Sequence, residues 1–367
     1  MYRLIRPLLF ALPPRAAHAL GMLALAPIEH AAPIRALVRA WTAPPDPRLV
    51  TRAMGLTFPS PIGVAGGFDK NALRTRALSA LGFGFVELGT VTALAQAENP
   101  TPNLFRLPAD RALINRLGFP NQGAAAVAAR LAARGGPSAA GVPVGLSIGK
   151  SRAVPLDPIE PAIADYLASF REARRAADFV VINVSSPNTK DLRAMQGPAA
   201  ARALLSAIAR QSAEETRGPR RPLLVKVAPD LSDEALEALL AVVEEVGLDG
   251  VVATNTTVRR DGLATSPAVI EAAGAGGLSG PPLRARALEV VRRSRARLGP
   301  RATVIGVGGV ETADHALDLI RAGADLVQIY TGFIYGGPGL PAALARGLAE
   351  RVDRAGARSL AELRGGG

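Results

Sequence analysis

The chain has 367 residues, 49% of them hydrophobic, so it has ample length to bury a core and is not a disordered protein. It has no cysteine, which excludes a disulfide framework and a cysteine nucleophile, and its scattered histidines (His18, His30, His315) indicate no metal site. The net charge of +12 could suit nucleic acid or an anionic membrane, but widely spread arginines with few aromatic residues among them argue against nucleic acid.

The first forty-odd residues are predicted to form short amphipathic helices separated by prolines, over Tyr2–Leu12, Pro14–Leu25 and Ile34–Trp41. No apolar run approaches the ~20 residues that a membrane-spanning helix needs. The break at Pro13-Pro14-Arg15 argues against a secretory signal. Six basic and two acidic residues in positions 1–50 (6 − 2 = +4) favour contact with an anionic lipid surface. A helical cap packed on the main domain is an equal alternative.

A proline-rich stretch at residues 43–47 predicts a stiff linker, which divides an N-terminal region, residues 1–45, from a main domain, residues 46–367. In the main domain, short runs rich in valine, isoleucine and leucine alternate with amphipathic helical patterns, as expected for parallel strands covered on both faces. The predicted strands are Ile62–Ala65, Phe83–Gly89, Val144–Ile148, Phe179–Val184, Leu223–Ala228, Gly250–Thr254, Thr303–Val307 and Leu326–Tyr330. Helices are predicted over Asn71–Leu81, Ser232–Val246 and Ala313–Ala322.

This repeating pattern predicts an α/β fold, a (β/α)8 TIM barrel with a small N-terminal helical extension. Eight strand–helix units across 269 residues (330 − 62 + 1) match the length of such a barrel, typically about 250 residues. An open, doubly wound sheet is the alternative, but no Gly-x-Gly-x-x-Gly fingerprint follows the first strand. Two connections, Thr90–Pro143 and Asn255–Ala302, are long, and loops of that length usually carry functional residues.

Polar and glycine-rich segments follow the predicted strands, at the end of a barrel where functional groups collect. The richest is Asn183–Thr189, which places two serines and two asparagines directly after an apolar strand, although such residues also form ordinary turns. The chain uses arginine for nearly every positive charge. Its lysines lie in or just after predicted strands, where a compact point charge suits a tight pocket; they are Lys70, Lys150, Lys190 and Lys226.

The residue types at these strand ends suit a small planar substrate and an organic cofactor. Carboxamides beside a lysine suit a flat ligand with carbonyls, ring N–H groups and a carboxylate. The asparagines in these loops are Asn115, Asn121, Asn183, Asn188 and Asn255. Glycine-rich turns at Gly306–Gly309 and Tyr330–Gly332 follow the last two strands, where barrels commonly bind phosphate. No pair of acidic residues stands in position for glycoside hydrolysis, and no set of metal ligands is visible. An organic cofactor with a phosphate tail would carry the chemistry, and flavin mononucleotide (FMN) is the natural candidate.

Seven motifs, in the same order along the chain, resemble those of class 2 (quinone-dependent) dihydroorotate dehydrogenases, the membrane-associated flavoenzymes of pyrimidine synthesis. The motifs are Gly67–Lys70, Glu87–Thr92, Asn115–Phe119, Asn183–Thr189, Ala253–Thr257, Gly276–Gly280 and Gly306–Gly309. The resemblance covers nearly the whole chain, including the N-terminal extension that distinguishes class 2 from the soluble class 1 enzymes. In class 1 the catalytic base is a cysteine, which this chain lacks.

The resemblance implies oxidation of dihydroorotate to orotate in de novo pyrimidine (UMP) biosynthesis, with one non-covalent FMN per chain and a respiratory quinone as final electron acceptor. Ser186 would take the C5 proton while C6 passes hydride to flavin N5, and a hydrogen-bonded relay would have to support so weak a base. Lys226 would stabilise the reduced flavin. The substrate would contact Lys70, Asn115, Arg116, Leu117, Gly118, Phe119, Asn183, Asn188, Asn255 and Thr256. FMN would contact Gly66, Gly67, Phe68, Asp69, Lys70, Thr90, Ser147, Asn183, Lys226, Thr254, Gly280, Gly309, Tyr330 and Thr331.

The same resemblance places contacts to the quinone head at His18 and Arg106, with ubiquinone or another membrane quinone entering between the N-terminal helices. It implies a peripheral protein on the cytoplasmic side of the cell inner membrane, with an anionic membrane surface as partner and neither metal nor nucleic acid. Two positions depart from the family pattern. Ser147 replaces a common asparagine, so that flavin contact is lost or water-mediated, and Thr331 replaces a frequent serine.

Three other interpretations remain open. The first is a soluble flavin barrel of class 1 type that uses fumarate or a partner subunit. The second is a barrel isomerase or phosphosugar-binding protein without flavin. The third is a non-catalytic protein of the membrane surface, whose function would survive Ser186→Ala and Lys226→Ala.

Overall fold

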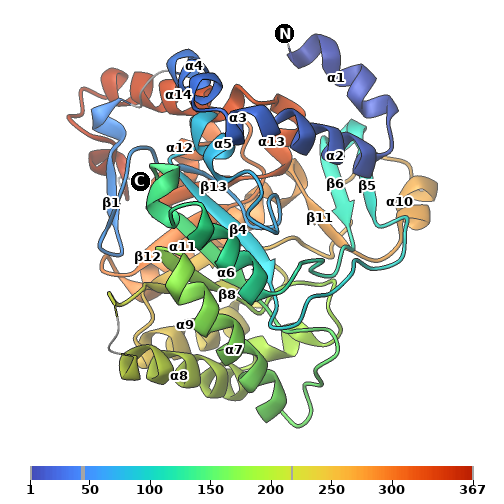
Figure 1. The fold of residues 1–367 in the computed structure, drawn as a ribbon, viewed down its shortest axis with the longest axis vertical. Helices are drawn as coiled ribbons and strands as arrows, with labels where there is room; N and C mark the ends of the chain where they lie inside the picture. The colour runs from blue at the N-terminus through green and yellow to red at the C-terminus, as the bar shows by residue number, and fades with distance from the viewer. Residues whose placement is uncertain (1, 43–45, 216–217, 366–367) are drawn as a thin grey trace.

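A computed structural model describes residues 2–42, 46–215 and 218–365 of the chain. At its centre, eight parallel strands close into a barrel in the spatial order β10-β12-β13-β3-β4-β7-β8-β9 (Figure 1). The strands are β3 (Ile62–Val64), β4 (Phe85–Val91), β7 (Val144–Ile148), β8 (Phe179–Asn183), β9 (Leu223–Val227), β10 (Gly250–Ala253), β12 (Thr303–Val307) and β13 (Leu326–Ile329). Almost all of their residues are buried, as expected for strands covered on both faces. The (β/α)8 barrel is confirmed, and its closure excludes the open sheet.

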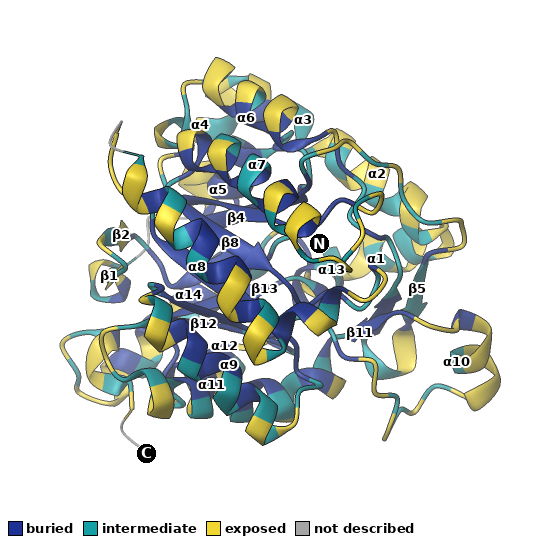
Figure 2. Cartoon of the chain, turned by 90° about the horizontal axis from the view of Figure 1, so that it is seen from below, coloured by how far each residue is buried: buried dark blue, intermediate teal, exposed yellow. Residues whose placement is uncertain are grey.

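Helices cover the outside of the barrel, with their exposed residues on the outer faces (Figure 2). They are α5 (Thr75–Ala80), α6 (Ala124–Ala133), α7 (Glu160–Ala176), α8 (Pro198–Glu214), α9 (Asp233–Val246), α11 (Arg284–Leu298), α12 (Ala313–Arg321), α13 (Thr331–Gly336) and α14 (Leu340–Arg354). The short helix α10 (Pro267–Ala273) lies to one side of the barrel, in the connection that follows β10 (Figure 1). The 3-10 turns are η1 (Pro47–Leu49), η2 (Pro108–Asp110), η3 (Pro137–Ala140), η4 (Leu192–Gln196), η5 (Pro281–Leu283) and η6 (Leu360–Leu363). Hydroxyl side chains begin two helices: Ser232 caps α9 and Thr312 caps α12.

Two small antiparallel sheets stand outside the barrel. The strands β1 (Thr51–Ala53) and β2 (Leu56–Phe58) form a hairpin. The strands β5 (Leu104–Leu107), β6 (Ala112–Asn115) and β11 (Gly277–Ser279) form a sheet in the order β11-β6-β5, which lies beside the barrel (Figure 1). This sheet joins the two long connections, so segments far apart in sequence meet there.

Aromatic rings fill the bottom of the barrel, the end away from the polar loops. Phe85 and Phe179 lie in an apolar cluster that draws on most of the barrel strands. A glycine on the adjacent strand pairs with each ring: Gly63 with Phe85, and Gly145 with Phe179. A Cβ at Gly63 or Gly145 would lie 2.4 or 2.3 Å from the ring, so only glycine leaves room. Phe58 of the β1–β2 hairpin packs edge-on against Phe85, with ring centroids 5.4 Å apart, and closes the floor.

Four helices precede the barrel: α1 (Tyr2–Ala11), α2 (Pro14–Ala24), α3 (Ala26–His30) and α4 (Ala32–Thr42). They are bound to the barrel, since Tyr2 Oη donates to Ile334 O at 2.6 Å and buried Glu29 accepts from Ala77 N at 3.0 Å. They also carry eight of the thirteen large apolar side chains that are exposed in the described part of the chain. No helix within the described residues is both long and apolar enough to cross a membrane.

Some boundaries differ from those expected from the sequence. The helix predicted over Asn71–Leu81 begins only at Thr75, because the buried carboxylate of Asp69 accepts hydrogen bonds from the N–H groups of Leu73 and Arg74 and holds a tight turn there. The N-terminal region contains an additional short helix, α3, in a stretch where prolines interrupt the apolar pattern. The predicted linker lies partly at residues 43–45, outside the described residues, so the domain boundary stays a prediction.

Gly145→Ala is expected to destabilise the fold by about 1–3 kcal/mol, the usual cost of overpacking, because the added carbon would meet the Phe179 ring at 2.3 Å. Gly21→Ala is the matched control: it lies within α2, has nothing within 4 Å of the added carbon, and should be neutral or slightly stabilising. Denaturant unfolding measures both. Equal stability of the two variants would contradict this account of the barrel floor.

Candidate active site

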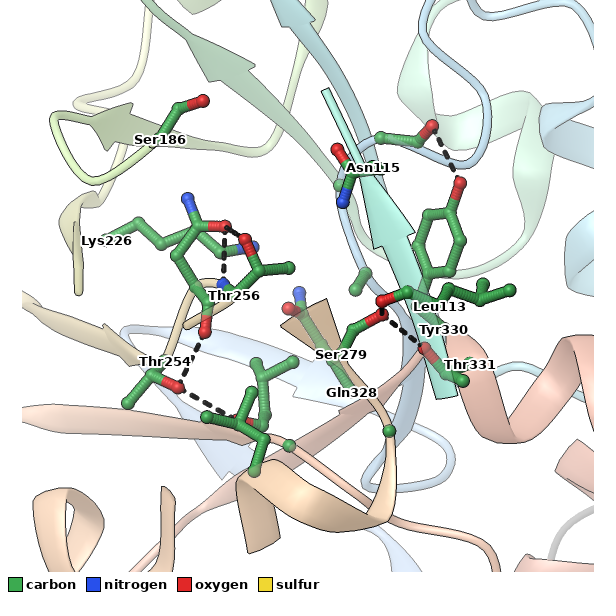
Figure 3. Close-up of a pocket in the computed structure, with 18 of the residues that line it drawn as sticks. Leu113, Asn115, Ser186, Lys226, Thr254, Thr256, Ser279, Gln328, Tyr330 and Thr331 are labelled. Carbon is green, nitrogen blue, oxygen red and sulfur yellow. Dashed lines mark hydrogen bonds between the residues drawn. The ribbon is translucent and has the colours of Figure 1, made fainter. Parts of the chain in front are cut away.

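A pocket opens at the carboxyl ends of the barrel strands, where the β11-β6-β5 sheet forms part of its wall. Its empty volume is about 1070 Å³, including the part open to solvent, which is enough for a cofactor and a small substrate. Figure 3 shows Ser186, Lys226 and Thr256 on one side of this space and Asn115, Tyr330 and Thr331 on the other. The predicted site residues that line it are Gly66, Gly67, Lys70, Thr90, Asn115, Leu117, Gly118, Phe119, Asn183, Ser186, Asn188, Lys226, Thr254, Asn255, Thr256, Gly280, Gly309, Tyr330 and Thr331.

Ser186 lies in the pocket wall, on the loop that follows β8, and only 4% of its surface is exposed. Its Oγ accepts a hydrogen bond from the N–H of Asn188 at 3.2 Å, which closes a turn within the loop. Asn188 reaches the small sheet, where its Nδ2 donates to Asn115 Oδ1 at 2.9 Å. The Oδ1 of Asn188 is buried and has no hydrogen-bond partner among the described residues, so it is available to a ligand.

Asn183 and Asn255 organise the neighbouring part of the wall. Asn183 Nδ2 donates to Thr90 Oγ1 at 2.9 Å, and Thr90 in turn is 3.0 Å from Ser147 Oγ. Asn255 Nδ2 donates to Ser185 Oγ at 3.0 Å. These bonds link the ends of β4, β7, β8 and β10 through their side chains. A network of this kind holds the polar groups in place before any ligand arrives.

Lys70 supplies a positive charge to the pocket. Its Nζ donates to Gly67 O at 2.6 Å. Desolvation by the surrounding protein lowers the pKa of Lys70 to about 8, against the opposing effect of the nearby carboxylates Asp69 and Glu98. Lys70 is therefore mostly protonated at neutral pH but close to titration, and an anionic ligand group beside it would favour the charged form.

A buried carboxylate lies beneath the pocket. Glu87 of β4, Lys226 of β9 and Gln328 of β13 each stand two residues beyond a floor side chain on the same strand, and none is more than 5% exposed. Glu87 Oε2 accepts from Gln328 Nε2 at 2.6 Å, and Glu87 Oε1 is 3.7 Å from Lys226 Nζ. Gln328 Oε1 lacks a partner in the described structure, although the residue lines the pocket. Glu87 and Gln328 are not among the predicted site residues, although polar residues within apolar strands are a visible signal.

Glycine-rich turns form the end of the pocket that follows β12 and β13. Gly309 has a φ of +66°, and a Cβ there would lie 2.9 Å from a neighbouring side chain. At Gly332 a Cβ would lie 2.1 Å from Val310 O. Thr331 Oγ1 donates a hydrogen bond to Ser279 Oγ at 2.8 Å, which connects β11 to this end of the pocket (Figure 3). Turns of this kind bring backbone N–H groups close to a ligand, and barrels commonly bind phosphate in this position.

Four predicted contact residues do not line the pocket. Asp69 holds the turn before α5, and Ser147 is fully buried behind Thr90. Phe68 packs with its ring against other aromatic side chains. The guanidinium of Arg116 points away and donates to main-chain carbonyls outside the pocket. These side chains lie behind the wall of the pocket, and their expected contacts with FMN or substrate stay predictions.

His18 and Arg106 lie where the N-terminal helices meet the barrel, outside the main pocket. His18 packs edge-on against Phe68, with ring centroids 5.6 Å apart. Burial, with a contribution from the charge of Lys70, lowers the pKa of His18 to about 4, so its ring is neutral. Arg106 donates to Leu12 O at 2.7 Å and lines a second, apolar cavity beside the α1–α2 turn, which His18 does not line. Their predicted quinone contacts stay predictions.

Comparison with known proteins connects this pocket to one enzyme family. Residues 48–352 match the sequence model of the family described as dihydroorotate dehydrogenase. A Thermobifida fusca protein named dihydroorotate dehydrogenase (quinone) is 52% identical over 326 residues, which cover 89% of this chain and 85% of that protein. A Rhodococcus opacus protein of the same name is 49% identical over 367 residues, which cover 100% of this chain and 99% of that protein.

A solved structure agrees with these sequences. The crystal structure of DHODH in complex with ferulenol from Eimeria tenella is similar with a TM-score of 0.82 and 34% sequence identity, over 96% of this chain and 95% of that chain. Sequence, fold and the order of the strand-end motifs therefore point the same way. The chain belongs to the dihydroorotate dehydrogenase family, and it is an oxidoreductase of the quinone-dependent class.

Proposed function

We propose that this pocket oxidises dihydroorotate to orotate in pyrimidine biosynthesis, with FMN as the bound cofactor and a membrane quinone as the final electron acceptor. The observation that carries the proposal is that Ser186, the carboxamide wall and Lys226 line one cavity, with Glu87 buried 3.7 Å from Lys226 beneath it. In this reaction the substrate loses a proton from C5 and a hydride from C6, and a C5=C6 double bond forms. The pocket therefore needs a base, an electron acceptor and groups that hold a small anionic ring.

The lining of the pocket fits FMN in three respects. The turns at Gly309 and Gly332 leave no room for a Cβ, and they would hold the phosphate with backbone N–H groups. The unpartnered Oε1 of Gln328 would accept a hydrogen bond from a ring N–H. The ammonium of Lys226, held beside Glu87, would favour negative charge on the reduced ring. When bound, the flavin would accept the hydride and pass electrons to the quinone.

Ser186 is the proposed base, and the groups around it would hold the substrate. The N–H of Asn188 already donates to its Oγ, which would stabilise negative charge as the serine proton leaves. A serine also needs an acceptor for that proton, and Thr189 offers a buried hydroxyl on the same loop that has no partner within the described part of the chain. The linked carboxamides of Asn115 and Asn188 would bind ring carbonyl and N–H groups, and Lys70 the carboxylate.

The N-terminal region, residues 1–45, would attach the protein to the membrane and admit the quinone to the barrel domain, residues 46–367. Leu4, Leu8 and Leu37 are 81%, 73% and 72% exposed on helices that otherwise dock on the barrel. Exposed apolar side chains in this number mark an interaction surface, and basic residues nearby suit anionic lipids. We propose peripheral attachment on the cytoplasmic side of the cell membrane, with quinone entering beside His18 and Arg106.

Ser186→Ala is expected to keep the yellow flavin but to slow flavin reduction by dihydroorotate by about 10²–10⁴-fold, the usual contribution of a general base. Anaerobic stopped-flow absorbance measures this half-reaction. As a control, the same variant reduced with dithionite should pass electrons to a quinone at the wild-type rate. Reduction of the flavin by dihydroorotate at a near-normal rate would show that Ser186 is not the base. Electron transfer to fumarate but not to quinone would favour a class 1 mechanism.

Orotate affinity is expected to fall as the pH rises through about 8, because the folded-state pKa of Lys70 is lowered to about 8 and only its charged form, present below that pH, binds a carboxylate. The limiting slope is about tenfold per pH unit, for one proton bound with the ligand. Titration of the flavin spectrum with orotate from about pH 6 to about pH 9 measures the affinity. Lys70→Met should bind more weakly and without this slope. An unchanged slope in Lys70→Met would assign the titration to another group.

Leu4→Glu/Leu8→Glu is expected to weaken binding to vesicles of anionic phospholipid by about 100-fold or more, because each buried leucine contributes about 1.5 kcal/mol or more. Quinone turnover on vesicles should fall with it, whereas flavin reduction by dihydroorotate should not change. Leu94→Glu, at a side chain 53% exposed on the barrel domain, is the matched control and should change neither. Equal loss of both half-reactions would instead make the helices a structural cap.

A further inference from the structure

Arg193 lies behind the pocket, in the 3-10 turn η4 that follows the Ser186 loop. Its guanidinium donates from Nε to Ser185 O at 3.1 Å and from Nη2 to Thr256 O at 2.9 Å. Its Nη1 donates to Asp230 Oδ2 at 2.7 Å. The three acceptors belong to the loops after β8, β10 and β9, so one planar group joins three neighbouring loops at the rim of the barrel.

Asp230 holds this guanidinium and extends the tether. Its carboxylate also accepts from the hydroxyl of Thr257 and, at 3.1 Å, from the N–H of Val258, both on the loop after β10. The side chains of Arg193 and Asp230 are only 24% and 15% exposed. Charge-assisted hydrogen bonds shielded from water in this way are stronger and better ordered than those of an exposed ion pair.

The two carbonyls that Arg193 holds adjoin residues of the proposed reaction. The carbonyl of Ser185 shares a peptide plane with the N–H of Ser186, so fixing that carbonyl orients the backbone that leads into the base. Thr256 itself lines the pocket, beside Asn255. We propose that Arg193, anchored by Asp230, is a positioning residue that fixes the base Ser186 relative to the substrate contacts Asn255 and Thr256. Its effect on catalysis rests on the proposed function, whereas the tether between the loops does not.

Arginine is required at this position for a geometric reason. The three acceptors surround a planar fork whose N–H groups point in fixed directions, and no side chain but arginine offers such a fork. A lysine ammonium is a compact point charge that can keep the bond to Asp230 but cannot reach all three acceptors together. Arg193→Lys therefore removes the tether while it preserves the charge, which makes it the more informative variant.

Hydrogen–deuterium exchange tests the tether without any assumption about the reaction. In flavin-containing Arg193→Lys and Arg193→Ala, residues 184–190 and 255–259 are expected to exchange roughly tenfold faster than in the wild type, because their loops open more often. Arg202→Lys is the matched control. Arg202 forms an exposed ion pair with Glu245 through Nε and Nη2, so this variant should leave exchange in both segments unchanged. Exchange at the wild-type rate in Arg193→Ala would overturn the proposal.

Flavin reduction tests the consequence for catalysis. The limiting rate with saturating dihydroorotate is expected to fall about 10–100-fold in both variants, as for a small misplacement of reacting groups. Reoxidation by quinone should stay at the wild-type rate, and added guanidinium ion should restore part of the reduction rate in Arg193→Ala. Loss of both half-reactions alike would overturn the positioning role. Failure of dihydroorotate to reduce the wild-type protein would contradict the proposed function instead, and the exchange result would still stand.

Discussion

The position of the pocket depends on the aromatic side chains that fill the barrel interior at the end opposite the polar loops. Phe85 and Phe179 occupy the floor only because Gly63 and Gly145 beside them carry no side chain, and Phe58 closes the end from outside the barrel. Protein interiors pack without large voids. Because side chains fill the floor of this barrel, the pocket lies at the opposite end, at the carboxyl ends of the strands. The floor and the core between strands and outer helices are apolar, and the polar groups lie in the upper layer.

The layer between floor and pocket shows how a polar interior constrains its neighbours. Burying Glu87 and Lys226 costs desolvation energy, which their ion pair and the bond from Gln328 offset. The carboxylate also restricts the segment after the neighbouring strand β3, since a Cβ at Gly66 would lie 2.3 Å from Glu87 Oε1. Gly66 was predicted as a cofactor contact, yet the buried carboxylate alone requires glycine there. One residue thus serves the packing of the barrel and the shape of the pocket.

Much of the fold could be predicted because parallel strands covered on both faces leave apolar runs that are hard to mistake. The strand-end rule then placed Ser186 and Asn188 in one cavity before their contacts were known. The direction in which each side chain points was harder to predict from the sequence. A motif identifies a segment but not the direction of each side chain in it. Arg116 was therefore expected in the pocket, although its guanidinium points away. Glu87 was missed because a strand read in isolation does not show which face turns into a closed barrel.

The positioning residue was out of reach for a different reason. Arg193 is one of many arginines in the chain, and it stands outside the strand-end segments that the sequence analysis selected. Its proposed role depends on hydrogen bonds to three acceptors, in Ser185, Asp230 and Thr256, which lie 8, 37 and 63 positions away along the chain. No periodicity or spacing in the sequence encodes a meeting of that kind. Only the closed order of the strands brings the loops after β8, β9 and β10 side by side.

That strand order also separates the two halves of the proposed reaction. In the closed barrel, β13 and β3 lie across from β8 and β9. The Ser186 loop and its Arg193–Asp230 tether follow β8 and β9. The N-terminal helices meet the opposite side, where His18 packs on Phe68, and Phe68 packs on Tyr330 of the pocket wall with ring centroids 5.8 Å apart. The base and the proposed quinone contacts would then lie on different sides of the barrel, so the N-terminal helices could change without disturbing the base.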